Sequence, residues 1–241
     1  MASAPEIERA ATLAFFEGRG RSAEPECVYS RTMYQDDRPD LVRARDAHEK
    51  ATILPRLEVG PESRVVDVGC GVGRWADALV GRVSAYLGVD FSPSLLAIAE
   101  KRFASRPEFV FQQGAAEDVG AMNLRLDPPF DVVILSGVLA YLTEDGAAHC
   151  LSGSAGLLTR GGRLYLREPV ARERPFTLSR RYSEELGAEY SAKYRTVEQY
   201  RLMLESHAPG LSLRHEGEAL PPALQNRRET SQHFFVLVQN G

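Results

Sequence analysis

The stretch Asp67-Val68-Gly69-Cys70-Gly71-Val72-Gly73 joins an apolar run at Val65–Val68 to a helical pattern that begins near Trp75. Its alternating glycines let the backbone turn sharply and let a ligand approach without side chains in the way. Three glycines after an acid are more than a simple turn requires. The pattern therefore predicts a ligand-binding loop between a buried strand and the helix that follows it.

A dinucleotide site is one alternative for this loop, because its motif is G-x-G-x-x-G. Gly69 and Gly71 fit the first two positions, but Arg74 stands at the third. An arginine there would obstruct the close packing of helix on strand that the third glycine permits. The sequence therefore disfavours a dinucleotide.

Short apolar runs alternate with helical patterns from Ser63 onward. Most runs lack polar alternation, so they predict parallel strands covered on both faces, with helical crossovers. We expect an α/β fold, a doubly wound seven-stranded sheet, mostly parallel, with helices on both faces and an antiparallel C-terminal hairpin. The expected strands are Val65–Val68, Ala85–Val89, Phe109–Phe111, Val132–Leu135, Arg163–Leu166, Leu211–His215 and His233–Val238. The expected helices are Leu41–Arg56, Trp75–Val80, Pro93–Ala104, Glu144–Leu158 and Thr196–His207.

The chain is expected to divide into a helical segment at 1–60, which lacks strand-like runs, and a core at 61–241. A polar insertion at 171–195 follows the fifth core strand, and long loops in compact domains are usually functional. Its arginines could bind a carboxylate or phosphate. Glutamates interleave with them, which favours a solvated helical face over an anion clamp.

Composition restricts the class of partner. The chain has 241 residues, 44% of them hydrophobic, and a net charge of −4, which suits one large domain and argues against a nucleic-acid binder. No apolar run approaches a length of about 18 residues, so no membrane span is predicted. Cys27, Cys70 and Cys150 lie far apart without zinc spacing, so we expect no metal site. The polar start of the chain resembles no secretion signal, so we expect a reducing cytoplasm.

The glycine loop resembles the D-x-G-x-G-x-G signature of the class I S-adenosylmethionine-dependent methyltransferases. The resemblance covers roughly residues 40–240 and implies S-adenosyl-L-methionine as cofactor. It implies that the loop lies against the methionine part of the cofactor, with the acid ordering the loop and holding the amino group. The loop residues expected at the cofactor are Asp67, Gly69, Cys70, Gly71 and Gly73.

Other strand ends extend this resemblance. Asp90 ends the second strand, where its carboxylate can accept both ribose hydroxyls, and Phe91 is expected to border the adenine. Ser136 ends the fourth strand, where open α/β sheets bind ligands.

The segment at 113–118 resembles the family's loop around the adenine edge. Ala115 stands where an aspartate is common in the family. We therefore expect the main chain of Ala115 and Ala116 to read the adenine, with Glu117 or Asp118 as an alternative acceptor.

Two regions are expected to build the acceptor pocket, the insertion and a tyrosine-rich stretch at 29–34. In many small-molecule members of the family such a stretch folds over the cofactor as a lid, which implies cofactor contacts for Tyr29 and Tyr34. Surface packing of the N-terminal helices is the alternative.

Methyl transfer from a sulfonium is a one-step displacement that needs mainly alignment of donor and acceptor. A base is required only when the acceptor atom carries a proton. The candidates are Glu168, at the end of the fifth strand, then Tyr141 and His233.

The resemblance therefore implies methyl transfer to an O, N or C atom of a small metabolite, expected in bacterial specialised metabolism. A peptide or protein N-terminal methyltransferase is one alternative, because Gly71-Val72-Gly73-Arg74-Trp75 resembles the G-x-G-R turn of such enzymes. A member of the fold that binds the cofactor without methylating is another. We expect a small-molecule acceptor as partner, no nucleic acid and no membrane, and leave a homodimer open.

Overall fold

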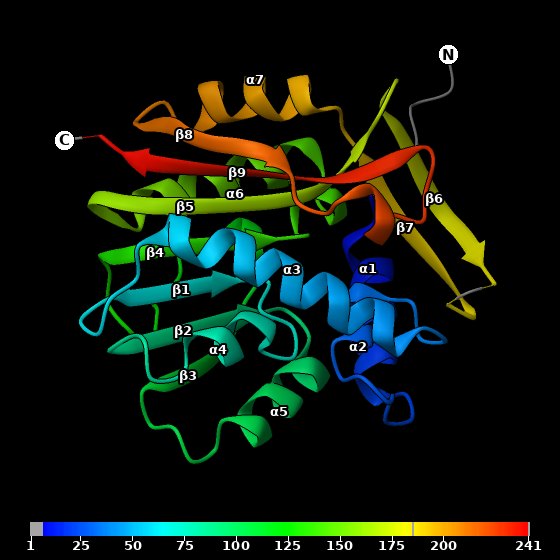
Figure 1. Cartoon of the computed structure of the whole chain (residues 1–241), viewed down its shortest axis with the longest axis horizontal. Helices are drawn as coiled ribbons and strands as arrows, with labels where there is room; N and C mark the ends of the chain where they lie inside the picture. The colour runs from blue at the N-terminus through cyan, green and yellow to red at the C-terminus, as the bar shows by residue number, and fades with distance from the viewer. Residues whose placement is uncertain (1–6, 185, 241) are drawn as a thin grey trace.

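The computed structural model describes residues 7–184 and 186–240. Its centre is a seven-stranded sheet in the order β3-β2-β1-β4-β5-β9-β8, with helices on both faces (Figure 1). The first five strands run parallel, and β9 pairs antiparallel with both β5 and β8. The predicted fold class, including the antiparallel pair at the C-terminus, is confirmed.

The strands of this sheet agree closely with the predicted runs, although most are longer. They are β1 (Arg64–Val68), β2 (Ala85–Asp90), β3 (Phe109–Gln113), β4 (Phe130–Ser136), β5 (Leu158–Ala171), β8 (Leu211–Glu218) and β9 (Thr230–Gln239). The helices are α1 (Arg9–Arg21), α2 (Ser30–Met33), α3 (Pro39–Leu57), α4 (Arg74–Leu79), α5 (Pro93–Arg102), α6 (Glu144–Gly156) and α7 (Val197–His207). Short 3-10 turns occur at η1 (Ala116–Asp118), η2 (Leu139–Tyr141) and η3 (Pro222–Leu224).

Successive residues of the central strands face opposite sides of the sheet, which explains why their runs are apolar throughout. Val66 packs with residues of α6 and α7, whereas its neighbour Val65 packs with residues of α3, α4 and α5. In Figure 1, α3, α4 and α5 lie in front of the sheet and α6 lies behind it. No helix in the described ranges is long and apolar enough to cross a membrane.

The insertion forms a hairpin of its own, β6 (Phe176–Ser183) and β7 (Ala188–Tyr194), drawn in yellow in Figure 1. The prediction of a solvated helical face at 171–195 is therefore wrong. The ring of Phe176 stacks on that of Tyr194 across the two strands, with 4.7 Å between centroids. Such cross-strand aromatic pairs stabilise a hairpin, and interleaved charges are equally compatible with its exposed face.

The order of the strands positions a ligand site. β1 lies between β2 and β4, so the chain connections leave the sheet in opposite directions on its two sides. In open α/β sheets, ligands bind beyond the carboxyl ends of the strands at such a switch point. The hairpin and the N-terminal helices α1 and α2 lie at that end of the molecule (Figure 1).

Candidate active site

A cavity of about 740 Å³ opens beyond the carboxyl ends of β1, β2, β4 and β5. Its walls come from the glycine loop, α1, the segment around α2, the hairpin and the connection from β8 to β9. This volume lies within the ordinary range for small-molecule sites. The cavity therefore joins the predicted cofactor loop to the predicted acceptor region.

The glycine loop needs glycine for its backbone angles. Gly69, Gly71 and Gly73 have φ of +78°, +53° and +77°, values that residues with a side chain rarely adopt. A Cβ atom on Gly69 would lie 2.5 Å from Val138 Cγ2, and one on Gly71 would lie 2.7 Å from Thr32 Cγ2. The loop is thus pressed between the β4 end and α2, with Gly69 and Cys70 lining the cavity.

Asp90 lines the cavity at the end of β2 and is almost fully buried. Its Oδ2 accepts a hydrogen bond of 2.8 Å from the Gly71 N–H, and its Oδ1 accepts one of 2.9 Å from the Ser92 N–H. Burial raises the pKa of Asp90 to about 6, although these backbone donors oppose the shift. Each oxygen retains capacity for a further hydrogen bond, which is what a ribose diol requires.

Asp67 also lines the cavity, and its Oδ2 accepts a hydrogen bond of 2.7 Å from the Tyr86 hydroxyl. Burial raises the pKa of Asp67 to about 7. Phe91 and Ser136 line the cavity as predicted, and so do Ala116 and Glu117. Ala115 does not line it.

Two tyrosines meet in the wall of the cavity. The hydroxyl groups of Tyr34 and Tyr141 form a hydrogen bond, and the Tyr141 ring packs edge-on against Phe16 at 5.1 Å. Burial raises the pKa of both phenols. Tyr141 is therefore protonated at neutral pH, so it can donate a hydrogen bond but cannot act as a base.

Comparison with known proteins agrees with this geometry. Residues 66–164 match the family described as a methyltransferase domain. A trans-aconitate 2-methyltransferase of Methylobacterium nodulans is 36% identical over 127 residues, covering 52% of this chain and 45% of that protein. These matches support a class I S-adenosylmethionine-dependent methyltransferase. The predicted family, enzyme class and cofactor are thereby confirmed.

Solved structures share the fold at lower identity. A phosphoethanolamine N-methyltransferase of Haemonchus contortus superimposes with a TM-score of 0.67 and 18% identity, covering 97% of this chain and 50% of that one. The N-methyltransferase NodS of Bradyrhizobium japonicum, in complex with S-adenosylhomocysteine, gives a TM-score of 0.65 and 14% identity, covering 96% and 100%. This methyltransferase spans less than two thirds of the length of the curated relatives it matches, such as 45% and 60% of two of them.

The glycine loop of this methyltransferase leaves no room for a side chain at Gly71. Gly71→Ala should weaken binding of S-adenosylhomocysteine by about tenfold or more, because the new Cβ displaces the loop or α2 and small misplacements in a site are costly. Gly81→Ala is the matched control, since Gly81 has a φ of +70° but no atom within 4 Å of a built Cβ. Calorimetric titration measures both affinities, and equal losses would show that backbone strain alone matters.

Glu168 is not available as a base in this methyltransferase. It is fully buried and does not line the cavity. Its Oε1 accepts hydrogen bonds from the N–H groups of Val138 and Leu139, both at 2.8 Å, and its Oε2 accepts one of 3.1 Å from Ala140. The carboxylate therefore holds the turn after β4 in place, and the geometry does not support the base predicted from its position at a strand end.

His233 lies on β9 and does not line the cavity either. Its ring packs against Phe235, 4.9 Å between centroids, and Phe235 belongs to the core on the side of α6 and α7. Within residues 7–184 and 186–240, its buried Nε2 has no hydrogen-bond partner. The position does not support the predicted catalytic role.

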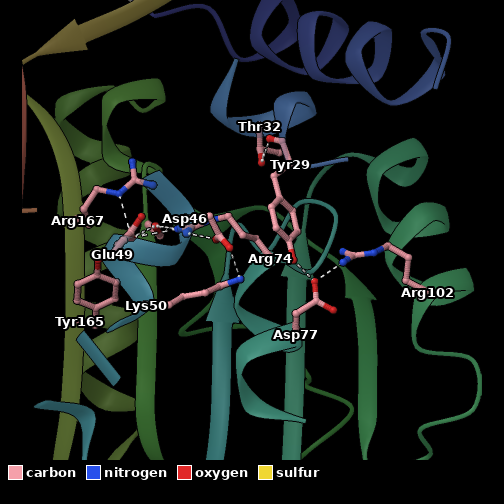
Figure 2. Close-up of polar contacts among 11 residues, drawn as sticks. Tyr29, Thr32, Asp46, Glu49, Lys50, Arg74, Asp77, Arg102, Tyr165 and Arg167 are labelled. Carbon is pink, nitrogen blue, oxygen red and sulfur yellow. Dashed lines mark hydrogen bonds and ion pairs between the residues drawn. The ribbon is translucent and has the colours of Figure 1, made fainter. Parts of the chain in front are cut away.

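Tyr29 lies outside the cavity lining, unlike Tyr34. Its hydroxyl donates to the Asp77 carboxylate, and its ring lies between the cations of Lys50 and Arg102 (Figure 2). Tyr29 therefore attaches the N-terminal segment to α4 rather than facing the site, and no cofactor contact is supported for it.

A buried ion network beside the cavity was not expected from the sequence. Glu49 of α3 accepts hydrogen bonds from Arg74 at 3.1 Å, from Arg167 at 3.3 Å and from the Tyr165 hydroxyl at 2.7 Å (Figure 2). Its neighbour Asp46 binds Arg74 at 2.9 Å and Lys50 at 2.7 Å. The signal in the sequence was the presence of two acids in the apolar stripe of α3, whose buried residues are Val42, Asp46, Glu49, Ile53 and Leu57.

Proposed function

We propose that this methyltransferase transfers a methyl group from S-adenosylmethionine to an oxygen, nitrogen or carbon atom of a small molecule. The observation that carries the proposal is the continuous cavity from the glycine loop to the hairpin, which has room for donor and acceptor side by side. The name of the relative from Methylobacterium nodulans, a trans-aconitate 2-methyltransferase, supports a small acceptor. The setting in bacterial specialised metabolism, a cytoplasmic location and a homodimer stay predictions.

The residues at the glycine-loop end fit the cofactor. Asp90 would accept the ribose hydroxyls, and Phe91 and Ala116 would border the adenine. Asp67 would attract the amino group, as opposite charges at short range do. Gly69 lines the cavity with backbone alone, since a Cβ there would lie 2.5 Å from Val138 Cγ2, and a ligand can lie directly against such backbone. When bound, S-adenosylmethionine supplies an electrophilic methyl carbon on a sulfonium sulfur, which keeps the electron pair of the broken bond.

The side chains of the site act mainly by alignment and enclosure. Of the two candidate bases near the carboxyl ends of β4 and β5, neither is free to accept a proton from the acceptor, because Glu168 is occupied by three backbone donors and the Tyr141 phenol is protonated. Holding donor and acceptor in line can by itself contribute about 7–11 kcal/mol to lowering a barrier. An acceptor that attacks as an anion or a free amine needs no base before it attacks, because a lone pair is already available on its nucleophilic atom.

We further propose that the segment around α2 acts as the lid over the site. Tyr34→Phe should lower kcat/KM for the acceptor by about tenfold, because the hydrogen bond to Tyr141 orders the wall of the cavity. It should cost only about 0.5–1.5 kcal/mol of unfolding free energy. Tyr29→Phe is the control, since it removes a comparable hydrogen bond outside the cavity. Equal kinetic losses in both variants would count against the lid.

The test of the function is product formation. The purified protein is incubated with methyl-labelled S-adenosylmethionine and a metabolite extract, and labelled products are separated by mass. Label in a small molecule supports the proposal, whereas label only in peptides favours N-terminal peptide methylation. Binding of the cofactor with no transfer to any acceptor would favour the non-methylating alternative.

A further inference from the structure

The charges that line the cavity are divided between its two ends. Acidic side chains prevail at the end formed by β1, β2 and η1, where Asp67, Asp90 and Glu117 line the cavity together with one cation, Arg74. Arginines prevail at the end formed by α3, β5, the hairpin and the connection from β8 to β9, where Glu49 and Glu229 also line the cavity; the arginines are Arg45, Arg167, Arg181 and Arg227. β2 and β5 lie on opposite sides of β1 and β4 in the sheet, so the two ends are separated by the order of the strands.

Arg167 presents a guanidinium that its protein partners use only in part. Its Nε contacts Glu49 at 3.3 Å and its Nη1 donates to Gln232 Oε1 at 3.0 Å. Glu49 also forms an ion pair with Arg74. The cluster therefore contains two carboxylates and three cations; the carboxylates are Asp46 and Glu49, and the cations are Arg74, Arg167 and Lys50. Figure 2 shows the terminal nitrogens of Arg167 directed away from Glu49. In this cluster the cations outnumber the carboxylates that pair with them by one.

Arg181 supplies a second cation on the opposite wall. It lies on β6 and lines the cavity, and the described residues offer it no ion pair or hydrogen bond. Two other arginines of the insertion are already paired, since Arg180 contacts Glu189 at 3.2 Å and Arg195 contacts Glu144 at 3.2 Å. Unlike them, Arg181 lines the cavity with a guanidinium that none of the described residues binds.

We propose that the acceptor is a small molecule that carries an oxyanion, a carboxylate or a phosphate, bound between Arg167 and Arg181. Guanidinium groups bind such oxygens through paired N–H donors. The site would hold the acceptor by its anionic group and place its nucleophilic atom toward the acidic end, where the cationic donor binds. This inference rests on the proposed function. It disfavours a peptide amino terminus, which is a cation and would meet arginines.

The test separates a metabolite extract on an anion-exchange resin before the labelling reaction. Label in molecules from the retained fraction supports the inference, and label only in molecules from the unretained fraction overturns it. Treating the retained fraction with phosphatase distinguishes the sources: a phosphate acceptor is lost, whereas a carboxylate acceptor survives. Label in neither fraction, with S-adenosylhomocysteine still bound by calorimetry, overturns the proposed function and this inference with it.

Variants connect the result to the two arginines. Arg167→Gln and Arg181→Gln should each raise the KM for the retained acceptor by about tenfold or more, as loss of a charge-assisted hydrogen bond does. Their affinity for S-adenosylhomocysteine should stay within about twofold, because neither residue lies at the acidic end. Arg180→Gln, on the same strand but paired with Glu189, should leave both constants unchanged. A loss of cofactor affinity in either variant instead would assign that arginine to the cofactor and overturn the inference for it.

Discussion

Glu49→Ala should lower the free energy of unfolding by about 3–5 kcal/mol, the usual cost of removing one partner of a buried ion pair. The Glu49 carboxylate is shared by Arg74, Arg167 and the Tyr165 hydroxyl, and its side chain is only 3% exposed. Without this carboxylate, the guanidinium groups of Arg74 and Arg167 would lose the negative charge that they share. Urea denaturation followed by circular dichroism measures the difference.

Asp40→Ala is the matched control on the same helix. Asp40 is 98% exposed and pairs with Arg43 at 2.9 Å on the surface. Its removal should cost less than about 1 kcal/mol, because exposed ion pairs contribute little to stability. If the two substitutions cost the same, the network around Glu49 does not stabilise the fold.

The same carboxylate should give the protein a specific response to acid. Burial alone would raise the pKa of Glu49, but Arg167 and Arg74 outweigh it and lower the pKa to about 2. A lowered pKa means that the contribution of Glu49 is fully present above the unfolded pKa of about 4.3 and is lost as the pH falls toward about 2. Glu49→Gln should lack this part of the acid dependence when stability is measured across that range.

Asp90→Ala should weaken binding of S-adenosylhomocysteine by at least about tenfold while the protein stays folded. The proposed role of Asp90 gives it two charge-assisted hydrogen bonds to the ribose hydroxyls, and each such bond contributes about 1.5–3 kcal/mol. Asp118→Ala is the control, because Asp118 is an acid near the same end of the cavity that is 58% exposed and does not line it. Calorimetry on both variants decides, and an unchanged affinity in folded Asp90→Ala would remove Asp90 from the site.

The pH dependence of binding tests the same assignment without changing the shape of the site. The pKa of Asp90 is raised to about 6 in the free protein, so affinity should fall as the pH drops through that value and the carboxylate becomes neutral. Asp90→Asn should bind weakly at every pH and lose this step. Asp67, whose pKa is raised to about 7, titrates nearby, so persistence of the step in Asp90→Asn would assign it to Asp67 instead.

The fold could be predicted from the sequence because its signals are local. Continuous apolar runs such as Val65–Val68 identify buried strands, and the glycines after Asp67 identify the turn that borders the cavity. The hairpin was missed because it depends on pairing between residues such as Phe176 and Tyr194, which lie 18 positions apart in the chain. Charge interleaving at 171–195 fits an exposed strand as well as an exposed helix.

The site could be predicted only where a strand end fixes a side chain. Asp90 lies in the cavity wall as expected, because its strand ends there. Glu168 also stands toward the end of a strand, but the backbone N–H groups of the neighbouring turn take both of its oxygens. The ion network around Glu49 could not be predicted, because its partners, such as Arg74 and Arg167, are far away in the sequence.

The acids at one end of the cavity have a consequence for turnover. Asp67 and Asp90 lie where the donor would bind, and the donor is a cation, whereas the thioether left after methyl transfer is neutral. Electrostatic attraction to these carboxylates is therefore lost once the methyl group has moved. The spent cofactor should be held less firmly than the fresh one, so product inhibition is weakened by the charge change that accompanies the chemistry.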